Sequence, residues 1–218
     1  MISNSEIRAR ARNTLGNSIF NEKWLFALLV GLIVSAISFV SAYIPFASII
    51  ITGPLTVGVI GIFLTATRTG EKVKIENMFH GFKDFAGNLS LYLMIAIFTF
   101  LWALLFIIPG IIKGLSYSMA IYIKNDHPEY TWKQCINESK RMMNGYKGKY
   151  FCLQLSFIGW MLLGALCCGV GVLWVTPYTY ASNAEFYNQL RAKEIGADET
   201  DANVGENEAA AGEDPYTL

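Results

Sequence analysis

The chain has 218 residues, of which 53% are hydrophobic and only 16% are charged, and its formal net charge at pH 7 is zero. The hydrophobic residues form long uninterrupted runs, which excludes an ordinary soluble domain. The zero net charge is the sum of two opposite regions, because residues 1–193 carry all 17 Lys and Arg residues while eight of the 17 acidic residues lie in 194–218. The basic body suits an anionic lipid surface.

The first 23 residues predict an amphipathic helix. Ser3-x-x-Glu6 has the form of a capping box, which satisfies backbone N–H groups at a helix start. Apolar residues then recur at helical spacing along one face, at Ile7, Ala11, Leu15 and Ile19. Such a helix lies in the membrane interface, covers the underside of a helical bundle, or does both.

Three apolar blocks follow, near residues 24–67, 88–123 and 150–190, and Lys113 is the one charged residue within 24–67, 88–123 and 150–184. A helix crosses a bilayer with about 20 apolar residues, and lipid requires its backbone groups to bond within the segment. Each block has a turn-forming sequence near its middle, at Pro45, at Pro109-Gly110 and at Gly169-x-Gly171. The expected fold is therefore all-α and polytopic, with six transmembrane helices arranged as three helical hairpins.

Two further amphipathic segments precede the second and third blocks. In 74–85, Ile75, Phe79 and Phe82 share a face that Met78 and Phe85 widen. In 131–143, Thr131-x-x-Gln134 is a second capping box, and the apolar face behind it contains Trp132, Ile136 and Met143. Between these elements, 126–129 (Asp-His-Pro-Glu) is interpreted as a chain turn, because a residue before proline disfavours helix.

The charges around the blocks predict the topology. Basic residues mark the cytoplasmic side, and they occur in 1–23, 68–87, 124–149 and 191–193. Each block should then cross an even number of times, which gives a multi-pass protein of the cell membrane with both termini cytoplasmic. The second and third blocks are short for two crossings, so their helices extend into the headgroups or one arm is a shorter re-entrant piece. The alternative is four crossings, with 124–149 outside.

The sequence divides into a transmembrane domain, residues 1–193, and an acidic tail, residues 194–218. The tail is rich in Ala, Gly and acidic residues and has too few large apolar residues to form a core. We expect it to be disordered, either as a solvating segment or as a peptide that binds a partner.

The candidate site residues are few. An ionisable residue inside a membrane helix is often functional, which makes Lys113 a candidate lipid or anion contact, together with Tyr117 and Tyr178. The alternatives are that Lys113 reaches the headgroups along its own stem, and that the tyrosines bond between helices.

Catalytic, metal and cofactor signatures are missing from the sequence. The four cysteines form no C-x-x-C pair, the two histidines are far apart, and no phosphate-binding loop or H-E-x-x-H motif occurs. We therefore expect a protein that is not an enzyme, with no catalytic residues, no bound metal and no cofactor.

Several runs of residues resemble one known family. They are IIPGIIKGLSYSMAIYI, the Asp126-x-Pro128-Glu129 sequence, ESKRMMNGYKGKYFCLQLSFIGW and a later TPY, in that order. Together they resemble the bacterial membrane-protein family catalogued as domain of unknown function nine-seven-five, over about residues 1–192. The resemblance implies a bacterial plasma-membrane location and a multi-helix fold, and it brings no reaction or catalytic residue. The positions that match the family pattern are expected to define the fold: Pro109, Gly110, Tyr117, Asp126, Pro128, Ser139, Gly145, Trp160, Pro177 and Tyr178.

The expected function is that of a non-enzymatic membrane organiser or modulator of protein or lipid partners. Its partners would be membrane lipids, other membrane proteins or a second copy of itself, and not nucleic acid. The alternative is a transporter, channel or lipid-handling component. That alternative predicts a polar cavity around Lys113 and the nearby tyrosines, whereas the first function predicts a closed bundle.

Overall fold

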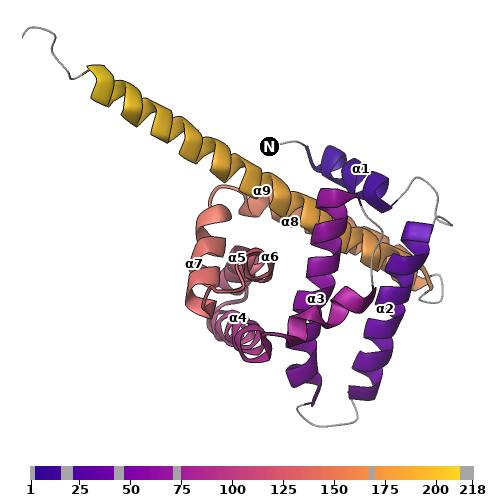
Figure 1. Cartoon of the computed structure of the whole chain (residues 1–218). Coiled ribbons are helices and arrows are strands. Elements are labelled where there is room, and N and C mark those ends of the chain that lie inside the picture. Colours follow the sequence, from indigo (N-terminus) through magenta and orange to yellow (C-terminus); the bar gives the residue numbers. More distant parts are fainter. Residues whose placement is uncertain (1–2, 16–21, 42–46, 71–74, 167–169, 212–218) are drawn as a thin grey trace, which may run out of the picture.

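The computed structural model describes residues 3–15, 22–41, 47–70, 75–166 and 170–211, and these ranges are almost entirely helical (Figure 1). No strand occurs within the described ranges, which confirms the all-α prediction. The elements in chain order are α1 (Asn4–Leu15), α2 (Glu22–Ser41), α3 (Ala47–Thr69), the 3-10 helix η1 (Ile75–Phe82), α4 (Phe85–Leu105), α5 (Ile107–Tyr117), α6 (Ala120–Asp126), α7 (Trp132–Met142), α8 (Lys147–Leu166) and α9 (Val170–Ala211).

Each apolar block forms a pair of helices that contact each other. The pairs are α2 with α3, α4 with α5, and α8 with α9. Residues 42–46 and 167–169 are not described, so the turns predicted at Pro45 and at Gly169 lie outside the described residues. Gly171, the last residue of the third predicted break, lies within α9.

The second hairpin turns at Phe106, earlier than the predicted Pro109-Gly110. Phe106 has extended backbone angles, φ −155° and ψ 134°, between the end of α4 and the start of α5. Pro109 lies in the first turn of α5, where a helix tolerates proline because its N–H would have no intrahelical partner. Gly110 serves packing, since a Cβ there would lie 2.6 Å from the Cα of Ala103. Small residues thus bring the two backbones into contact, as in membrane helix pairs.

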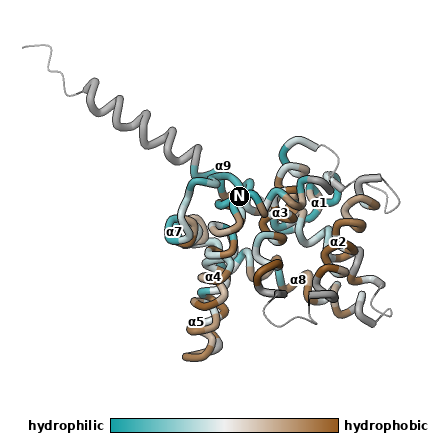
Figure 2. Tube along the Cα trace, turned by 60° about the horizontal axis from the view of Figure 1, so that its bottom comes forward, coloured by the Kyte–Doolittle hydropathy of each residue, from teal (hydrophilic) through white to brown (hydrophobic). Residues whose placement is uncertain are grey.

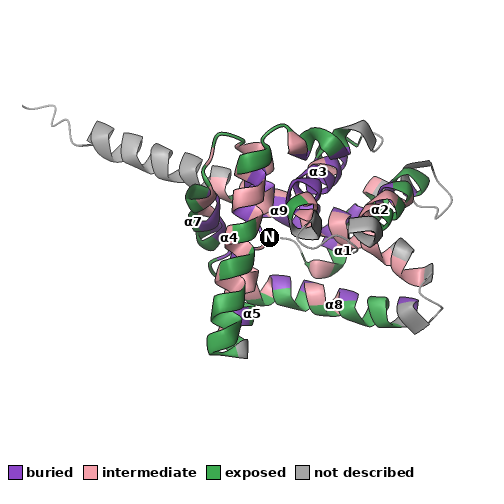
Figure 3. Ribbon diagram, turned by 90° about the horizontal axis from the view of Figure 1, so that it is seen from below, coloured by how far each residue is buried: buried purple, intermediate pink, exposed green. Residues whose placement is uncertain are grey.

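Two helices of the described chain are long and apolar enough to span a membrane: Ile50–Thr69 within α3, and Phe85–Leu105, which is α4. In α3, 61% of the most apolar window is buried, as in the core helix of many proteins, but in α4 only 11% is buried. Figures 2 and 3 show α4 as a largely uncovered apolar helix beside α5. The six predicted crossings are not confirmed and stay a prediction.

The length of α5 matters for that prediction. Its 11 residues extend about 16 Å at 1.5 Å per residue, roughly half of the hydrocarbon thickness of a bilayer. It fits the shorter re-entrant piece considered above, unless α6 completes the crossing after the bend at residues 118–119.

Helix α3 is central to the core and contacts η1 closely. A Cβ on Gly58 would lie 1.8 Å from the carbonyl oxygen of Met78, and one on Gly81 would lie 2.0 Å from that of Pro54. The backbones of α3 and η1 therefore touch at two points. The segment is a 3-10 helix and not the α-helix that the sequence pattern suggested, so Met78 is fully buried while Phe79 is 53% exposed.

Both predicted capping boxes are present. The Ser3 backbone N–H donates to Glu6 Oε2 at 2.8 Å, and the Glu6 N–H donates to Ser3 Oγ at 3.2 Å. Thr131 and Gln134 make the corresponding exchange at the start of α7. The predicted apolar faces are buried at Ile7, Ala11, Ile136 and Met143, while Leu15 and Ile19 lie outside the described side chains.

Ser139 of α7 forms hydrogen bonds with the free backbone groups at the bend between α5 and α6. Its hydroxyl donates to the carbonyl oxygen of Ser116 at 2.7 Å and accepts the N–H of Met119 at 3.2 Å. The side chain is fully buried. A buried backbone break is costly unless its groups find partners, so Ser139 stabilises this bend.

Replacing Ser139 by alanine should lower the melting temperature of the purified protein in mild detergent. The variant leaves the Met119 N–H without its partner, a loss of about 1–3 kcal/mol for a buried group. Ser90→Ala is the matched control, because the Ser90 hydroxyl donates to the Gly87 carbonyl oxygen within its own turn, at 2.8 Å. Equal melting temperatures for the two variants would contradict the role of Ser139.

Helix α9 runs from Val170 to Ala211 and includes Pro177. It therefore continues from the third hairpin into the first part of the acidic segment, and 212–218 lie outside the described residues. The division into a transmembrane domain and a disordered tail is not tested by this geometry and stays a prediction.

Candidate functional site

A pocket of about 450 Å³ lies where α1 meets α2, α8 and α9; we call it the α1 pocket. Helix α1 is fixed there by its buried residues Ile7 and Ala11 and by Asn4, whose amide donates to the carbonyl oxygen of Lys149 at 3.1 Å. The residues that line the pocket are Ser5, Arg8, Arg12, Trp24, Trp160, Val175 and Tyr178.

Two arginines one helical turn apart give the α1 pocket its charge. Arg8 donates to Ser156 Oγ at 2.5 Å, and the Tyr178 hydroxyl donates to the Arg8 carbonyl oxygen at 3.3 Å. Among the described side chains, no carboxylate lies within 4.0 Å of Arg8 or Arg12. Arg10, on another face of α1, does pair with a carboxylate, Glu185, at 3.4 Å. Within the described side chains, the positive charge of the pocket therefore has no carboxylate partner.

Aromatic side chains form the walls of the α1 pocket. Trp24 stands at the start of the first apolar block, and Trp160 of α8 is 56% exposed. Tyr178 is held edge-on against Phe157, with ring centroids 5.5 Å apart. Trp and Tyr are enriched at the membrane–water interface, where one end of the ring is apolar and the other is wet. The pocket combines basic groups with residues typical of that depth.

The three candidate residues from the sequence lie in two separate places. Tyr178 lines the α1 pocket, whereas Lys113 and Tyr117 are both on α5. The Lys113 ammonium lies 4.8 Å from the ring centroid of Trp102 on the facing helix α4. Tyr117 is buried at the base of the hairpin, with the Lys140 ammonium 5.6 Å from its ring centroid. A role in lipid or anion contact stays a prediction for each of them.

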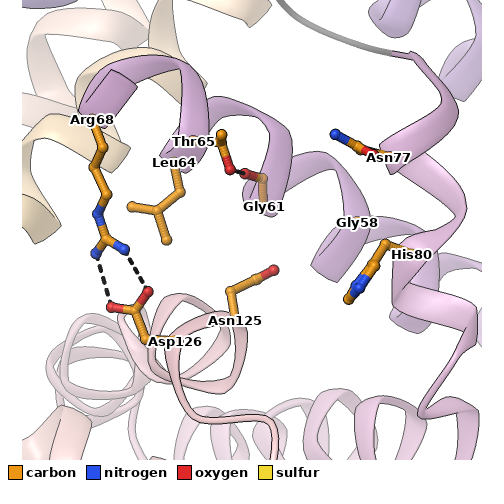
Figure 4. A pocket seen from close by; sticks show the side chains of 9 residues that line it. All are labelled: Gly58, Gly61, Leu64, Thr65, Arg68, Asn77, His80, Asn125 and Asp126. Carbon is orange, nitrogen blue, oxygen red and sulfur yellow. Dashed lines mark hydrogen bonds and ion pairs between the residues drawn. The ribbon is translucent and has the colours of Figure 1, made fainter. Parts of the chain in front are cut away.

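A second polar site, which we call the junction, joins α3, α6 and α9 through Asp126. Its carboxylate accepts two hydrogen bonds from Arg68, at 2.6 and 2.8 Å (Figure 4). Arg191 donates to it at 2.8 Å, and the Tyr187 hydroxyl donates at 2.8 Å. The Asp126 side chain is 6% exposed. Three elements far apart in the sequence are thus held by one carboxylate.

A polar cavity of about 320 Å³ opens beside the junction, between α3, η1 and α6. Figure 4 shows Asn77 and His80 on η1 facing the side chain of Asn125 across it. The Asn125 amide donates to the carbonyl oxygens of Val57 and Ile121, at 3.1 and 3.0 Å. The bond to Val57 ties α6 to α3, and the bond to Ile121 lies within α6, so the geometry assigns Asn125 to holding these two helices together.

Lys124 forms a second buried link next to the junction. Its side chain is 5% exposed, and its ammonium pairs with Asp84 at 2.8 Å. It also donates to the carbonyl oxygens of Pro128 and Tyr130, at 2.6 and 3.0 Å. The turn at 126–129 is therefore fastened to the base of α4 by a lysine with three oxygen partners.

Two of these carboxyls have pKa values below the ordinary value. Burial by itself would raise the pKa of Asp126, but hydrogen bonds from Arg68 and Tyr187 and the charge of Arg191 outweigh it and lower the pKa. The hydrogen bond from Lys124 lowers the pKa of Asp84. Both groups are therefore more acidic in the folded chain than the ordinary Asp value of 3.8.

The protein should consequently lose stability in acid. A carboxyl whose pKa is lower in the folded state contributes stability that is fully present above its unfolded pKa, and loses it as pH falls through the folded pKa. The contribution of these carboxyls to the melting temperature should therefore be constant between pH 7 and about pH 5. At pH values below about 4 the melting temperature should fall. Melting curves in detergent across this range measure the effect, and a melting temperature that rises below pH 4 would contradict it.

The described part of the chain contains no group of three His, Cys, Asp or Glu side chains able to hold a metal ion. Cys135 on α7 is buried, and burial raises the pKa of its thiol to about 11. Such a thiol is a poor nucleophile at neutral pH.

The sequence of the chain was compared with families of known proteins. A family model with the description "Protein of unknown function (DUF975)" matches residues 1–113 and 104–194. The chain belongs to this family. The resemblance expected from the sequence is thereby confirmed, and the match includes α1, the junction and α9 as far as residue 194. No curated protein and no solved structure matches the chain.

Several positions of the DUF975 pattern have structural roles here. Asp126 is the centre of the junction, and Ser139 satisfies the bend between α5 and α6. Gly110 permits contact between α4 and α5, and Gly145 has φ +78°, which favours glycine. These four residues thus have structural contacts, and the fold-defining role that the resemblance implies stays a prediction.

The sequence interpretation missed two features of this DUF975 protein. The family pattern includes Asp126, but the sequence does not identify its partners, because Arg68 and Arg191 are 58 and 65 residues away along the chain. Arg8 and Arg12 were interpreted only as topology markers. Their i, i+4 spacing was an available signal, because it places both side chains on one face of α1.

Proposed function

We propose that this protein is a multi-pass protein of the cell membrane that organises or modulates lipid and protein partners without catalysing a reaction. The observation that carries the proposal is the apolar hairpin of α4 and α5. Only 11% of the most apolar stretch of α4 is buried. Phe100, Leu104 and Ile108 are 68%, 71% and 72% exposed. A continuous apolar surface of this kind is unfavourable in water and favourable in lipid.

A basic helix at the base of the hairpin supports the same proposal. Helix α7 contacts α4 through Trp132, whose ring centroid is 6.1 Å from that of Phe98. Its residues Lys133, Lys140 and Arg141 are exposed. Basic residues beside an apolar hairpin are typical of the cytoplasmic interface, where they face anionic headgroups.

The absence of catalysis is part of the proposal. The buried charged groups of the described chain are engaged with one another, as in the pairs of Asp126 with Arg68 and of Lys124 with Asp84. Groups that hold helices together in this way are not available to exchange protons with a substrate. Organisation of partners on the basic cytoplasmic face requires no such exchange.

Cysteine labelling tests the location and the topology. In a chain without its native cysteines, Glu138→Cys on α7 should react with an impermeant thiol reagent only after the cell is opened. Phe106→Cys at the tip of the α4–α5 hairpin should react from outside if the hairpin crosses, and should be protected in lipid from both sides if it is re-entrant. Reaction of the residue-138 cysteine from outside, or recovery of the protein in the soluble fraction, would overturn the proposal. Mild-detergent purification with identification of bound lipids and proteins would then name the partners.

Transport remains the alternative function, and it predicts one polar cavity shared by Lys113 and the tyrosines. The structure instead has Lys113 against Trp102 on one hairpin and Tyr178 in the α1 pocket. We therefore favour organisation over transport.

Lys113→Met should change little. Lys113 is half-buried, and its contact with Trp102 is worth about 1–2 kcal/mol, so the melting temperature in detergent should fall only slightly. Lipid binding and any transport phenotype of cells that express the protein should stay at the wild-type level. A loss of transport in cells that contain normal amounts of the folded variant would favour the alternative.

A further inference from the structure

We propose that the α1 pocket binds the phosphate of an anionic glycerophospholipid from the cytoplasmic leaflet. The inference rests on the proposed membrane location and names the ligand class of one site within it. Arg8 and Arg12 would hold the phosphate oxygens, and the aromatic walls would surround the glycerol and the first part of the acyl chains.

Charge balance is the first argument. The junction arginines have a carboxylate, since Asp126 lies within 2.8 Å of both Arg68 and Arg191. The α1 pocket gives Arg8 and Arg12 no carboxylate among the described side chains. A guanidinium group is planar and binds phosphate with two parallel hydrogen bonds, so an external anion completes the pocket.

The shape and lining of the pocket distinguish a lipid from a free anion. A volume of about 450 Å³ is larger than one phosphate ion requires. Trp24, Trp160 and Val175 offer apolar surface that a hydrated ion would not use. Ser5 and the Tyr178 hydroxyl add polar groups beside the arginines, as an esterified headgroup needs.

The position of the pocket fits the headgroup level. Trp24 is the first residue of the charge-free block 24–67, so the pocket stands where the sequence changes from basic to apolar. Helix α1 is held against the body through Ile7 and Ala11, which are fully buried. The arginines are therefore positioned before the lipid arrives, which reduces the entropy lost on binding.

The test compares two double variants of the full chain in mild detergent. Arg8→Gln with Arg12→Gln removes both charges of the pocket, and Lys83→Gln with Lys193→Gln removes two exposed charges that do not line the pocket, as the matched control. Native mass spectrometry and tryptophan fluorescence would follow titration with short-chain phosphatidylglycerol, phosphatidylcholine and inorganic phosphate. Phosphatidylglycerol should bind the wild type most tightly, and its affinity should fall at least about tenfold in the pocket variant and less than about twofold in the control.

The outcomes separate the possible sources of the anion. Binding of inorganic phosphate as tight as that of phosphatidylglycerol would overturn the lipid assignment, and so would equal binding of phosphatidylcholine. Unchanged phosphatidylglycerol binding in the pocket variant would overturn the pocket itself. If the double variant does not fold, Arg12→Gln alone gives the test, since Arg12 is exposed and should still weaken binding when removed.

The test is independent of the proposed function. If the pocket variant binds lipid normally and still resides in the membrane, the proposed role of the α1 pocket is refuted and the proposed membrane function is not. If the protein binds the lipid in detergent but is recovered from the soluble fraction of cells, the proposed membrane function is refuted.

Discussion

Gly58→Ala should prevent the protein from accumulating in its folded form. The added Cβ would lie 1.8 Å from the carbonyl oxygen of Met78 and 2.8 Å from its carbonyl carbon. These are backbone atoms of η1, which cannot move aside as the end of a side chain can. Relief of the overlap requires separation of α3 from η1, and we expect a loss above about 4 kcal/mol, near the upper end for single substitutions. The yield of monodisperse protein on size exclusion in detergent, and its melting curve, measure the result.

The matched control is Gly31→Ala in α2, where a Cβ would have no atom within 4 Å. Alanine is the better helix former, so this variant should be as stable as the wild type or up to about 1 kcal/mol more stable. Gly81→Ala should repeat the loss, because its Cβ would lie 2.0 Å from the Pro54 carbonyl oxygen. Normal yield and melting of both the Gly58 and the Gly81 variants would show that α3 and η1 do not touch in this way.

Asp126→Asn should destabilise the junction by about 2–3 kcal/mol. The amide cannot supply the two charged oxygens that now accept hydrogen bonds from Arg68, Arg191 and Tyr187. Loss of one partner from a buried ion pair costs about 3–5 kcal/mol, but the two arginine side chains here are 32% and 39% exposed, and water screens part of the effect. The melting temperature in detergent should fall, and its dependence on pH between 5 and 3 should become weaker than in the wild type.

Glu138→Gln provides the comparison for that substitution. Glu138 pairs with Arg141 at 2.5 Å on the surface of α7, where the arginine side chain is 60% exposed. Exposed pairs contribute about 0–1 kcal/mol, so this variant should melt close to the wild type. Equal melting temperatures for Asp126→Asn and Glu138→Gln would contradict a role of the junction in the stability of the protein.

Local signals in the sequence were sufficient for much of the fold. The capping boxes at Ser3 and Thr131 identify the starts of α1 and α7, because each depends only on residues three positions apart. The long apolar blocks likewise indicate the helix pairs, since their length and lack of charge require no knowledge of neighbours. What these signals leave open is the number of crossings, because α5 ends after 11 residues at a bend that Ser139 of a distant helix stabilises.

Long-range contacts account for what the sequence did not predict. Proline and glycine marked a turn at 109–110, but Phe106 turns the chain and Gly110 is required by the approach of Ala103. Met78 is buried as its place on the apolar face predicts, but Phe79 of that face is 53% exposed, since contact with α3 selects a 3-10 helix over the α-helix that the spacing suggested. The role of Asp126 depends on residues about 60 positions away in both directions, which no local pattern can indicate.

The junction also determines when during synthesis the fold can be completed. Asp126 and Arg191 are separated by 65 residues, so the ribosome releases the carboxylate well before its second arginine. At a translation rate of roughly 5–20 residues per second, the interval is on the order of 3 to 13 seconds. During this interval Asp126 of the nascent chain can pair only with Arg68. Tyr187 and Arg191 are synthesised when nearly all of the apolar hairpins have been made. Helix α9 therefore completes a contact that α3 and α6 began.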